Sequence, residues 1–385
     1  MISGASVGLI RCRFCRSDDG SVVADLGTQP GCEFFPRLAD PGPDPVFPLR
    51  LWLCAGCGLA QLADDMAVPE DPQGVQPEAL TRQAADAVAR LAASGILPSA
   101  GTVAEFPSPH GGTWLSLLTS RGLVPASAGE PADVVLDCCF GLMHAEDQEA
   151  AFRERAARTR PGGLLLVQFH SLAAILQRTE WNAIRHGHYA YYSVPAMRTM
   201  LAGVGLTAFA AFWFPLYGGT VLIAARHGAA AEADLAALTE REIGCGVLDP
   251  VAMKAFQEAA RSDGERLAGW LADERSHGRR VYGYGAASRS VGLLHSARAG
   301  RDLLCGVADV SAAKQGSRMP GTDIPVIGTD DLVTAEPESV LLFVPDLLDE
   351  VRAALPEIEA NGGRWVLADE VVGQAAHGGG DGLSA

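Results

Sequence analysis

The 385-residue sequence is poor in positive charge, and this narrows the functions open to it. It has 30 lysine and arginine residues against 46 aspartate and glutamate residues, for a net charge of -16 and a pI near 5.0. Binding to nucleic acid depends on a basic surface that neutralises backbone phosphates. The acidic balance therefore argues against a nucleic-acid partner, and a phosphate-bearing substrate would need a locally basic pocket.

Long apolar runs are also missing. Although 48% of the residues are hydrophobic, no window of about 20 uncharged apolar residues occurs, so we expect no membrane span. The N-terminus, MISGASVGLIRCRFC, lacks the charged-then-apolar layout of a secretory signal. We therefore expect a cytoplasmic protein of about two or three domains with no membrane partner. The oligomeric state stays open.

Four of the nine cysteines form two pairs. Cys12 and Cys15, then Cys54 and Cys57, give C-x2-C, 38 intervening residues and C-x2-C. Each pair can form a tight turn that presents two thiolates to one tetrahedral zinc ion. The proline- and glycine-containing segment between the pairs could hardly fold without such a link, which favours a structural zinc. The alternative is two unrelated pairs of reduced cysteines.

The rest of the chain alternates predicted helices and strands, which indicates an α/β fold. After a Pro/Gly/Asp-rich link, the second block predicts helices at 79–93, 111–118, 148–160 and 194–202 and strands at 103–106, 132–137, 164–169, 207–213 and 220–225. The third predicts a helix at 250–275, strand–turn–helix over 280–294, strands at 303–309, 339–345 and 364–369, and a helix after 349. We divide the chain into residues 1–75 (zinc-binding), 76–235 (a central α/β domain), 236–372 (a second, smaller Rossmann-like domain) and a disordered tail, 373–385.

The second block resembles a class I methyltransferase domain, most clearly in 155-RAARTRPGGLLLVQF-169 and the closing hairpin. The resemblance implies S-adenosylmethionine at a glycine-rich loop after the first strand and a carboxylate after the second. Here the loop is 105-EFPSPHGG-112, in which two prolines remove backbone donors. Only 25 residues separate Phe106 from Ala132, whereas each strand–helix–strand unit needs about 30. The domain is therefore truncated, with no clear second-strand carboxylate. The candidate cofactor residues are Glu105, Ser108, Gly111 and Gly112; S-adenosylmethionine is a doubtful cofactor, although a compact variant that still binds it stays open.

The segment 180-EWNAIRHGHYAYYS-193 holds half of the six tyrosines of the chain, with two histidines and an arginine. Imidazole and phenol groups transfer protons, and histidine titrates near neutrality. Core packing alone would favour leucine or phenylalanine, because buried hydroxyl groups need partners. The segment also follows the strand at 164–169, at the sheet edge where such folds bind substrates. We favour a catalytic or substrate-binding role, with core packing as the alternative.

Two glycine-rich turns hold the other tyrosines. One is 216-LYGGT-220; the other, 281-VYGYGAASR-289, lies between a predicted strand and a helix whose N-terminus suits a phosphate, with Arg289 as a cation. Lys314 and Arg318, beside the turn residues Pro320 and Gly321, could complete an anion pocket. A solvated loop is the equal alternative.

Together these motifs resemble the sugar C-methyltransferases that act on nucleotide-linked 4-keto deoxysugars. The likeness spans nearly the whole chain: DLGTQP and CGLAQL flank the cysteine pairs, and YGAASR, AD-x4-KQG-x-x-MPGTDIPV and VPDLLDEV follow in the last block. The resemblance implies a zinc-binding N-terminal domain, a central methyltransferase domain and a C-terminal Rossmann-like domain.

The family's active segment is similar to Tyr-His-Glu-His, and here it reads 185-RHGH-188. The resemblance implies that His188 is the base at the carbon beside the ketone; the family's Tyr and Glu are replaced. Its His-Gly-Gly-Ser turn appears as 217-YGGT-220. The candidate catalytic residues are His188, His186, Arg185, Tyr189 and Tyr191. The candidate substrate-binding residues are Tyr192, Tyr217, Gly218, Gly219, Thr220, Tyr284, Arg289, Lys314 and Arg318.

Three functions follow from this resemblance. The leading hypothesis is an enzyme that deprotonates a nucleotide-linked keto deoxysugar with His188 and gives epimerisation or keto isomerisation without S-adenosylmethionine. The enolate would need donors on its oxygen side, such as Tyr189, Tyr191 or Arg185. The second hypothesis is a working S-adenosylmethionine-dependent C-methyltransferase. The third is a non-catalytic partner that binds the sugar nucleotide.

Overall fold

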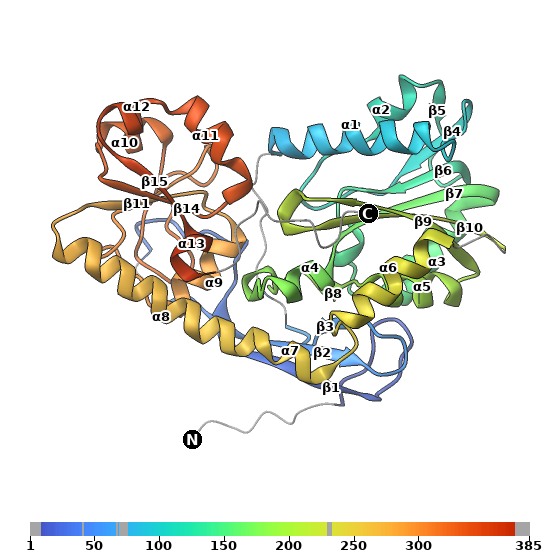
Figure 1. The fold of residues 1–385 in the computed structure, drawn as a ribbon, viewed down its shortest axis with the longest axis horizontal. Coiled ribbons are helices and arrows are strands. Elements are labelled where there is room, and N and C mark those ends of the chain that lie inside the picture. Colours follow the sequence, from blue (N-terminus) through green and yellow to red (C-terminus); the bar gives the residue numbers. More distant parts are fainter. Residues whose placement is uncertain (1–8, 41, 67, 69–75, 229–232, 374–385) are drawn as a thin grey trace.

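Three β-sheets organise the chain in the computed structural model, which describes residues 9–40, 42–66, 68, 76–228 and 233–373 (Figure 1). The predicted disordered tail lies outside the described residues except for Gly373, the left-handed cap of the last helix. No described helix is long and apolar enough to cross a membrane.

The N-terminal sheet is antiparallel and has the order β1-β2-β3-β8. Its strands are β1 (Gly20–Pro30), β2 (Val46–Cys54), β3 (Ala60–Leu62) and β8 (Ala190–Tyr191). The last of these belongs to the tyrosine-rich segment, and Tyr191 pairs with Ala60 of β3. The segment predicted to be catalytic is thus hydrogen-bonded to the cysteine-containing sheet.

The central sheet has the order β5-β4-β6-β7-β10-β9, in which β5, β4, β6 and β7 are parallel and β10 is antiparallel to its neighbours. Its strands are β4 (Gly101–Glu105), β5 (Leu123–Pro125), β6 (Ala132–Asp137), β7 (Thr159–His170), β9 (Leu206–Phe214) and β10 (Thr220–His227). Around it lie α1 (Glu78–Ala93), α2 (Leu115–Thr119), α3 (Gln148–Arg158), α4 (Leu172–Gln177), α5 (Val194–Gly203) and α6 (Ala233–Gly244). A single three-residue strand, β5, extends the sheet beyond β4. This short extension agrees with the truncated domain that the sequence predicts.

The C-terminal sheet is parallel and has the order β13-β12-β11-β14-β15, which is a doubly wound arrangement. Its strands are β11 (Val281–Tyr284), β12 (Val307–Ala308), β13 (Val326–Ile327), β14 (Ser339–Leu342) and β15 (Arg364–Leu367). Its helices are α9 (Ser288–Ser296), α10 (Thr329–Thr334), α11 (Leu348–Ala354), α12 (Glu357–Ala360) and α13 (Ala368–Val372). The short α7 (Pro250–Met253) and the long α8 (Ala255–Ser276) run from this sheet to β1 (Figure 1). The predicted α/β fold with three parts is confirmed.

Two helix boundaries differ from the predictions, and both lie next to glycine residues. The helix predicted from residue 111 begins at Leu115, because Gly111 and Gly112 have φ values of 74° and 87°, which no right-handed helix allows. The helix predicted to reach Arg160 ends at Arg158, and Pro161–Gly163 lie inside β7, where the pairing with β6 is irregular.

The apolar core crosses the predicted domain limits. One buried cluster joins Leu51 of β2, Ile175 of α4, Leu267 of α8 and Val291 of α9. The predicted limits at residues 75, 235 and 372 therefore remain a proposal about sequence segments, and the packing makes the three sheets interdependent.

Candidate active site

Three histidines from separate loops meet at one edge of the central sheet. His110 follows β4, His144 ends the short helix η1 (Leu142–His144) after β6, and His188 lies in the tyrosine-rich segment. One ring nitrogen from each lies within 4.8 Å of the others, and the His144 ring centroid is 4.9 Å from that of His110 and 4.8 Å from that of His188. Because β4 and β6 are parallel, their carboxyl ends meet at the edge where α/β folds bind ligands. We call His110, His144 and His188 the histidine cluster.

His170 and Tyr217 adjoin the histidine cluster. His170 ends β7, the parallel neighbour of β6, and its ring stacks on Phe140 at 4.3 Å. Tyr217 has a left-handed backbone with φ of 52°, and its ring lies 5.4 Å from that of His170. Burial raises the pKa of Tyr217 to about 12, so its hydroxyl keeps its proton at neutral pH.

Burial keeps these imidazoles neutral. It lowers the pKa of His188 and of His170 well below the ordinary range, and the charge of Arg185 adds to the effect. Burial lowers the pKa of His144 to about 3, with only the Gly187 backbone acting in the opposite sense. Among the described residues, no hydrogen-bond partner meets Nδ1 of His188 or Nδ1 of His170, whereas His144 has the Gly187 backbone as a partner. Buried polar atoms without partners are uncommon and point to a missing ligand.

Arg185 is in contact with the cluster, but its charge is already engaged. Its guanidinium lies 3.2 Å from Nε2 of His110 and forms a buried ion pair with Glu33. Burial disfavours the charge, but Glu33 outweighs it and the pKa of Arg185 is raised. The hydroxyl of Tyr191 accepts from the Arg185 N–H at 2.8 Å and donates to the Arg185 carbonyl at 3.2 Å. Tyr191 therefore fixes the loop, while its ring lies 6.2 Å from His188.

The other candidates from the tyrosine-rich segment lie outside the histidine cluster. Nε2 of His186 lies 3.0 Å from the Pro48 carbonyl, next to β2. The ring of Tyr189 lies 4.7 Å beneath the guanidinium of Arg13. Tyr192 is buried in the core and donates its hydroxyl hydrogen to Gln148. Of the predicted catalytic side chains, the structure thus brings together His188 and Arg185.

The glycine turn before β10 is shaped by close packing. A Cβ on Gly218 would lie 2.7 Å from a carboxylate oxygen of Glu180, and one on Gly219 would lie 2.4 Å from Cβ of Ala174. The hydroxyl of Thr220 donates to the Leu216 carbonyl at 2.9 Å. The turn holds Tyr217 at the sheet edge.

The predicted anion pocket in the C-terminal part is not assembled. Lys314 donates to the Ala286 carbonyl at 2.7 Å and lies 3.7 Å from a carboxylate oxygen of Asp309, while Arg318 forms a two-pronged ion pair with Asp44. At the expected phosphate cradle, the Ala286 N–H already donates to Asp309.

Two other predicted residues of this part have different surroundings. Tyr284 packs edge-on against Trp365 in the core. Arg289 pairs with Glu180 at 3.2 Å, and its guanidinium lies 6.0 Å above the ring of Tyr217. Arg289 is therefore the predicted cation that approaches the edge of the central sheet.

The polar groups of the loop expected to hold the cofactor form hydrogen bonds within the protein. Glu105 accepts hydrogen bonds from the Thr113 hydroxyl and the Trp114 N–H, at 2.5 and 2.7 Å, and so caps α2. Ser108 accepts from the N–H of His110 at 3.3 Å. The same backbone packs tightly elsewhere: a Cβ on Gly112 would lie 3.2 Å from Sγ of Cys139. The short β5 ends at Pro125 and carries no carboxylate.

The four paired cysteines converge on one point. Their sulfurs lie within 4.8 Å of one another, with 3.5 Å between Cys12 and Cys57 and between Cys15 and Cys54. Tetrahedral zinc with Zn–S bonds of about 2.3 Å places sulfurs about 3.8 Å apart, so the donor set fits zinc. Zinc there would join the turns before β1 and after β2 and would have no place left for a substrate.

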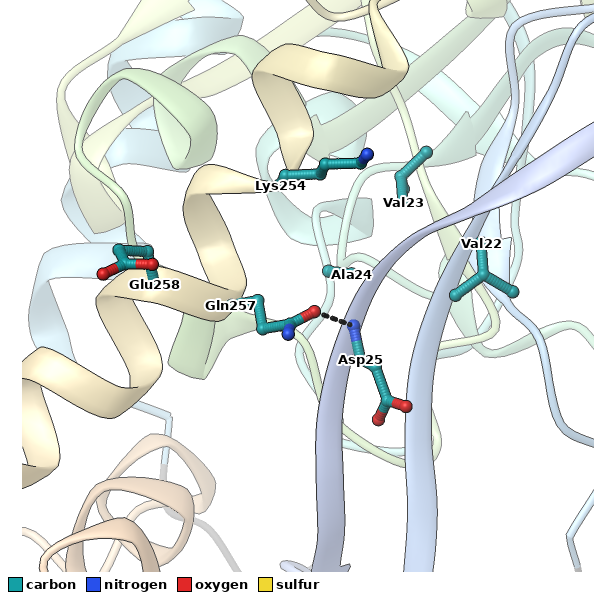
Figure 2. A pocket seen from close by; sticks show the side chains of 7 residues that line it. All are labelled: Val22, Val23, Ala24, Asp25, Lys254, Gln257 and Glu258. Carbon is teal, nitrogen blue, oxygen red and sulfur yellow. Dashed lines mark hydrogen bonds between the residues drawn. The ribbon is translucent and has the colours of Figure 1, made fainter.

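The histidine cluster was not predicted as a unit. His110, His144 and His170 each follow a parallel strand, and that position is the signal that could have found them. A surface hollow, by contrast, holds no catalytic group: residues 22–25 of β1 face Lys254, Gln257 and Glu258, and Gln257 accepts from the Asp25 N–H at 3.2 Å (Figure 2). None of its lining residues belongs to the cluster.

The buried carboxylate of Glu242 joins the end of β7 to the start of α5, and its titration predicts that stability depends on pH. It accepts hydrogen bonds from Ser171, just after β7, and from the N–H of Val194, at the start of α5. Burial raises its pKa to about 7, so the folded chain binds this proton more tightly than the unfolded chain. The protonated carboxyl group contributes its full stabilisation below about pH 4.5. As the pH rises from about 4.5 to about 7, the free energy of unfolding falls by about 3 kcal/mol in total.

The variant Glu242→Gln should remove this dependence, because an amide can donate to Ser171 and accept from Val194 without titrating. We expect urea unfolding to show the variant gaining stability relative to wild type between pH 5 and pH 8. Glu240→Gln, an exposed neighbour on α6, should leave the profile unchanged. Parallel profiles for wild type and Glu242→Gln would contradict the assignment.

The fold and the cysteine site define an α/β protein with a four-cysteine cluster that fits zinc, a six-stranded mixed sheet and a second, doubly wound sheet. Two segments of the chain match known families. Residues 12–70 match the family described as a zinc binding domain, and residues 215–368 match the one described as C-methyltransferase C-terminal domain. These two segments are thus similar to a zinc binding domain and to the C-terminal domain of C-methyltransferases.

Individual relatives are more distant. The C-methyltransferase NovU of Streptomyces niveus is 26% identical over 240 residues, which cover 60% of this chain and 55% of NovU. The match thus spans about half the length of that relative. Two solved structures are similar over part of the chain. The 1,6-didemethyltoxoflavin-N1-methyltransferase of Burkholderia thailandensis is 14% identical, covers 44% of this chain and 96% of its own, and has a TM-score of 0.28. The magnesium protoporphyrin IX methyltransferase of Synechocystis is 15% identical, covers 40% of this chain and 90% of its own, and has a TM-score of 0.29, so neither supports an argument.

Proposed function

We propose that this chain is an enzyme that removes a proton beside the ketone of a nucleotide-linked keto deoxysugar, with His188 as the base. The observation that carries the proposal is the buried imidazole of His188, whose Nδ1 has no partner among the described residues, at the ligand-binding edge of the sheet. The resemblance to the sugar C-methyltransferases supports a sugar substrate. In agreement with it, the matched relative is a C-methyltransferase, and residues 12–70 and 215–368 match the zinc binding domain and the C-methyltransferase C-terminal domain.

The proton transfer needs a base and a donor on the oxygen side. His188 takes the proton, the electrons of the C–H bond form an enolate, and its oxygen gains negative charge. A positioned hydroxyl stabilises that charge best in a site that excludes water. Tyr217 is protonated and adjoins His170, whereas the Tyr191 hydroxyl is engaged by Arg185. We therefore assign the donor role to Tyr217.

The fate of the enolate decides the reaction. The protonated His188 can return the proton to the carbon that lost it, which gives hydrogen exchange. An epimer forms when a solvent proton is delivered to the opposite face and His188 releases its own proton to solvent. An isomeric ketone forms when the hydroxyl proton on that carbon moves to the enolate oxygen and His188 then protonates the former carbonyl carbon. In each case the imidazole regains its neutral form, so atoms and charges balance with no reactant besides solvent.

We further propose that S-adenosylmethionine takes no part. Supporting this, Glu105 is engaged by Thr113 and Trp114, and the loop after β4 has prolines where the family resemblance implies glycines. Isothermal titration of the zinc-loaded protein with S-adenosylmethionine and S-adenosylhomocysteine should show no binding. Micromolar binding would make C-methylation, the second candidate function, the leading one; the match to the C-methyltransferase C-terminal domain favours that candidate.

A further inference from the structure

We propose that the histidine cluster is a second metal site, distinct from the four cysteines, which takes a borderline divalent ion such as Zn²⁺, Co²⁺ or Ni²⁺. His110, His144 and His188 each offer a ring nitrogen, and these nitrogens lie within 4.8 Å of one another. The inference goes beyond proton transfer, because it assigns the same imidazoles a ligand of their own.

The unpartnered nitrogens favour a metal. Nδ1 of His188 is buried without a hydrogen-bond partner among the described residues, and His144 is buried with a single backbone partner, Gly187. Leaving a buried polar atom unpaired costs about 1–3 kcal/mol, which a bound cation would recover. Coordination of a cation, which uses the nitrogen lone pair, satisfies one atom on each ring.

The geometry requires a small adjustment. Metal–nitrogen bonds of about 2.0–2.1 Å place tetrahedral ligands about 3.4 Å apart, so the rings must close by about 1 Å. His110 can supply that movement, because it lies in a loop followed by Gly111 and Gly112. Three histidines leave the fourth position of a tetrahedral ion open for water or a substrate oxygen.

The charges around the site permit a cation. Arg185 is the nearest positive group, 3.2 Å from Nε2 of His110, and its charge lowers the pKa of His188 and of His144. Its ion pair with Glu33 offsets this charge at His110. Binding must break or redirect the contact between Arg185 and His110. No carboxylate belongs to the described cluster, and all-imidazole sites select Zn²⁺, Co²⁺ or Ni²⁺ over Mg²⁺ and Ca²⁺.

Metal and proton compete for the same lone pair of His188. This consequence rests on the proposed function: a metal-bound imidazole cannot act as a base, so occupancy of the histidine cluster should switch off proton abstraction. The two sites would then divide their roles, with zinc at the cysteines holding the fold and metal at the histidines controlling the reaction.

Cobalt distinguishes the two sites by their ligands. The metal-free full-length chain is titrated with Co²⁺ and then dialysed, and bound metal is counted by plasma emission spectrometry. Thiolate ligands give strong near-ultraviolet charge-transfer bands, whereas imidazole ligands give only weak visible bands. We expect two metal ions per chain, with the thiolate bands appearing with one ion and the weak bands with the other.

Variants locate the second ion. His144→Ala should lower the count from two to one and remove the weak bands while keeping the thiolate bands. His277→Ala, in which the lost imidazole is exposed at the residue after α8, should keep both ions. A wild-type count of one, or a second ion that survives His144→Ala, would overturn the proposal.

Failure of the metal site and failure of the proposed function are distinguishable. Hydrogen exchange on the keto sugar is measured with the cysteines loaded and then with a second equivalent of Zn²⁺. Inhibition that His144→Ala relieves supports the inference, whereas unchanged exchange contradicts the switch. If no exchange occurs with zinc at the cysteines alone, the proposed function is contradicted. The metal site is then tested by the number of metal ions bound per chain.

Discussion

Replacing His188 with alanine is expected to reduce hydrogen exchange beside the ketone of a nucleotide-linked keto sugar by about 10²–10⁴-fold, the usual contribution of a positioned acid–base group. Burial keeps His188 neutral, so its lone pair is available, and no described group binds Nδ1. The same burial lowers its pKa and disfavours the imidazolium, so the negative charge that develops on the enolate must offset that cost. The measurement is deuterium incorporation from D₂O, followed by NMR, with no S-adenosylmethionine present.

Two controls make the loss specific. His277→Ala removes an exposed imidazole at the residue after α8 and should exchange at the wild-type rate. Zinc content and circular dichroism should show that His188→Ala still folds. Exchange at the wild-type rate in a folded His188→Ala protein would contradict the assignment of the base. Absence of exchange in wild type as well would favour the non-catalytic sugar-binding hypothesis.

Loss of one cysteine ligand is expected to have the second large effect. Cys57→Ser should abolish stoichiometric zinc binding and unfold the N-terminal sheet, because apparent binding energies of structural zinc in zinc-finger peptides are about 10–16 kcal/mol. The loss should reach the active site, since β8 pairs with β3 and holds the segment that contains His188. We therefore expect exchange activity to disappear together with zinc.

The matched control is Cys305→Ser, which changes a cysteine in the C-terminal part that lies outside the four-sulfur group. This variant should keep one equivalent of thiolate-bound zinc and its activity. The measurements are zinc content, thermal unfolding and exchange rate. A Cys57→Ser protein that folds and reacts like wild type would show that the four cysteines hold no structural ion.

Regular elements were predictable where the local pattern decides the outcome. The strands at 132–137 and 164–169 are short apolar runs in the sequence, and both are buried in the parallel part of the sheet. The cysteine pairs were equally clear, because two ligands on each tight turn are a local arrangement. The start of α2 was wrong by four residues, because the sequence does not show that Gly111 and Gly112 adopt positive φ.

The site itself was only partly predictable. His188 was singled out because it stands in an unusual segment, but His110 and His144 reach it through the order of the strands, which no local pattern contains. The tyrosines of the segment also have a structural explanation. Tyr191 and Tyr192 satisfy their buried hydroxyls with Arg185 and Gln148, so a hydroxylated ring here serves packing as much as chemistry.

The most direct test of the central claim is deuterium exchange by the wild-type protein, with zinc at the cysteines only and no S-adenosylmethionine. The probe is a nucleoside-diphosphate-linked 4-keto-6-deoxyhexose in D₂O, followed by ¹H NMR. We predict loss of the signal of a hydrogen beside the ketone, at a rate unaffected by added S-adenosylmethionine. No exchange until S-adenosylmethionine is added, followed by appearance of a methyl group on carbon, would contradict the account and establish methyl transfer instead.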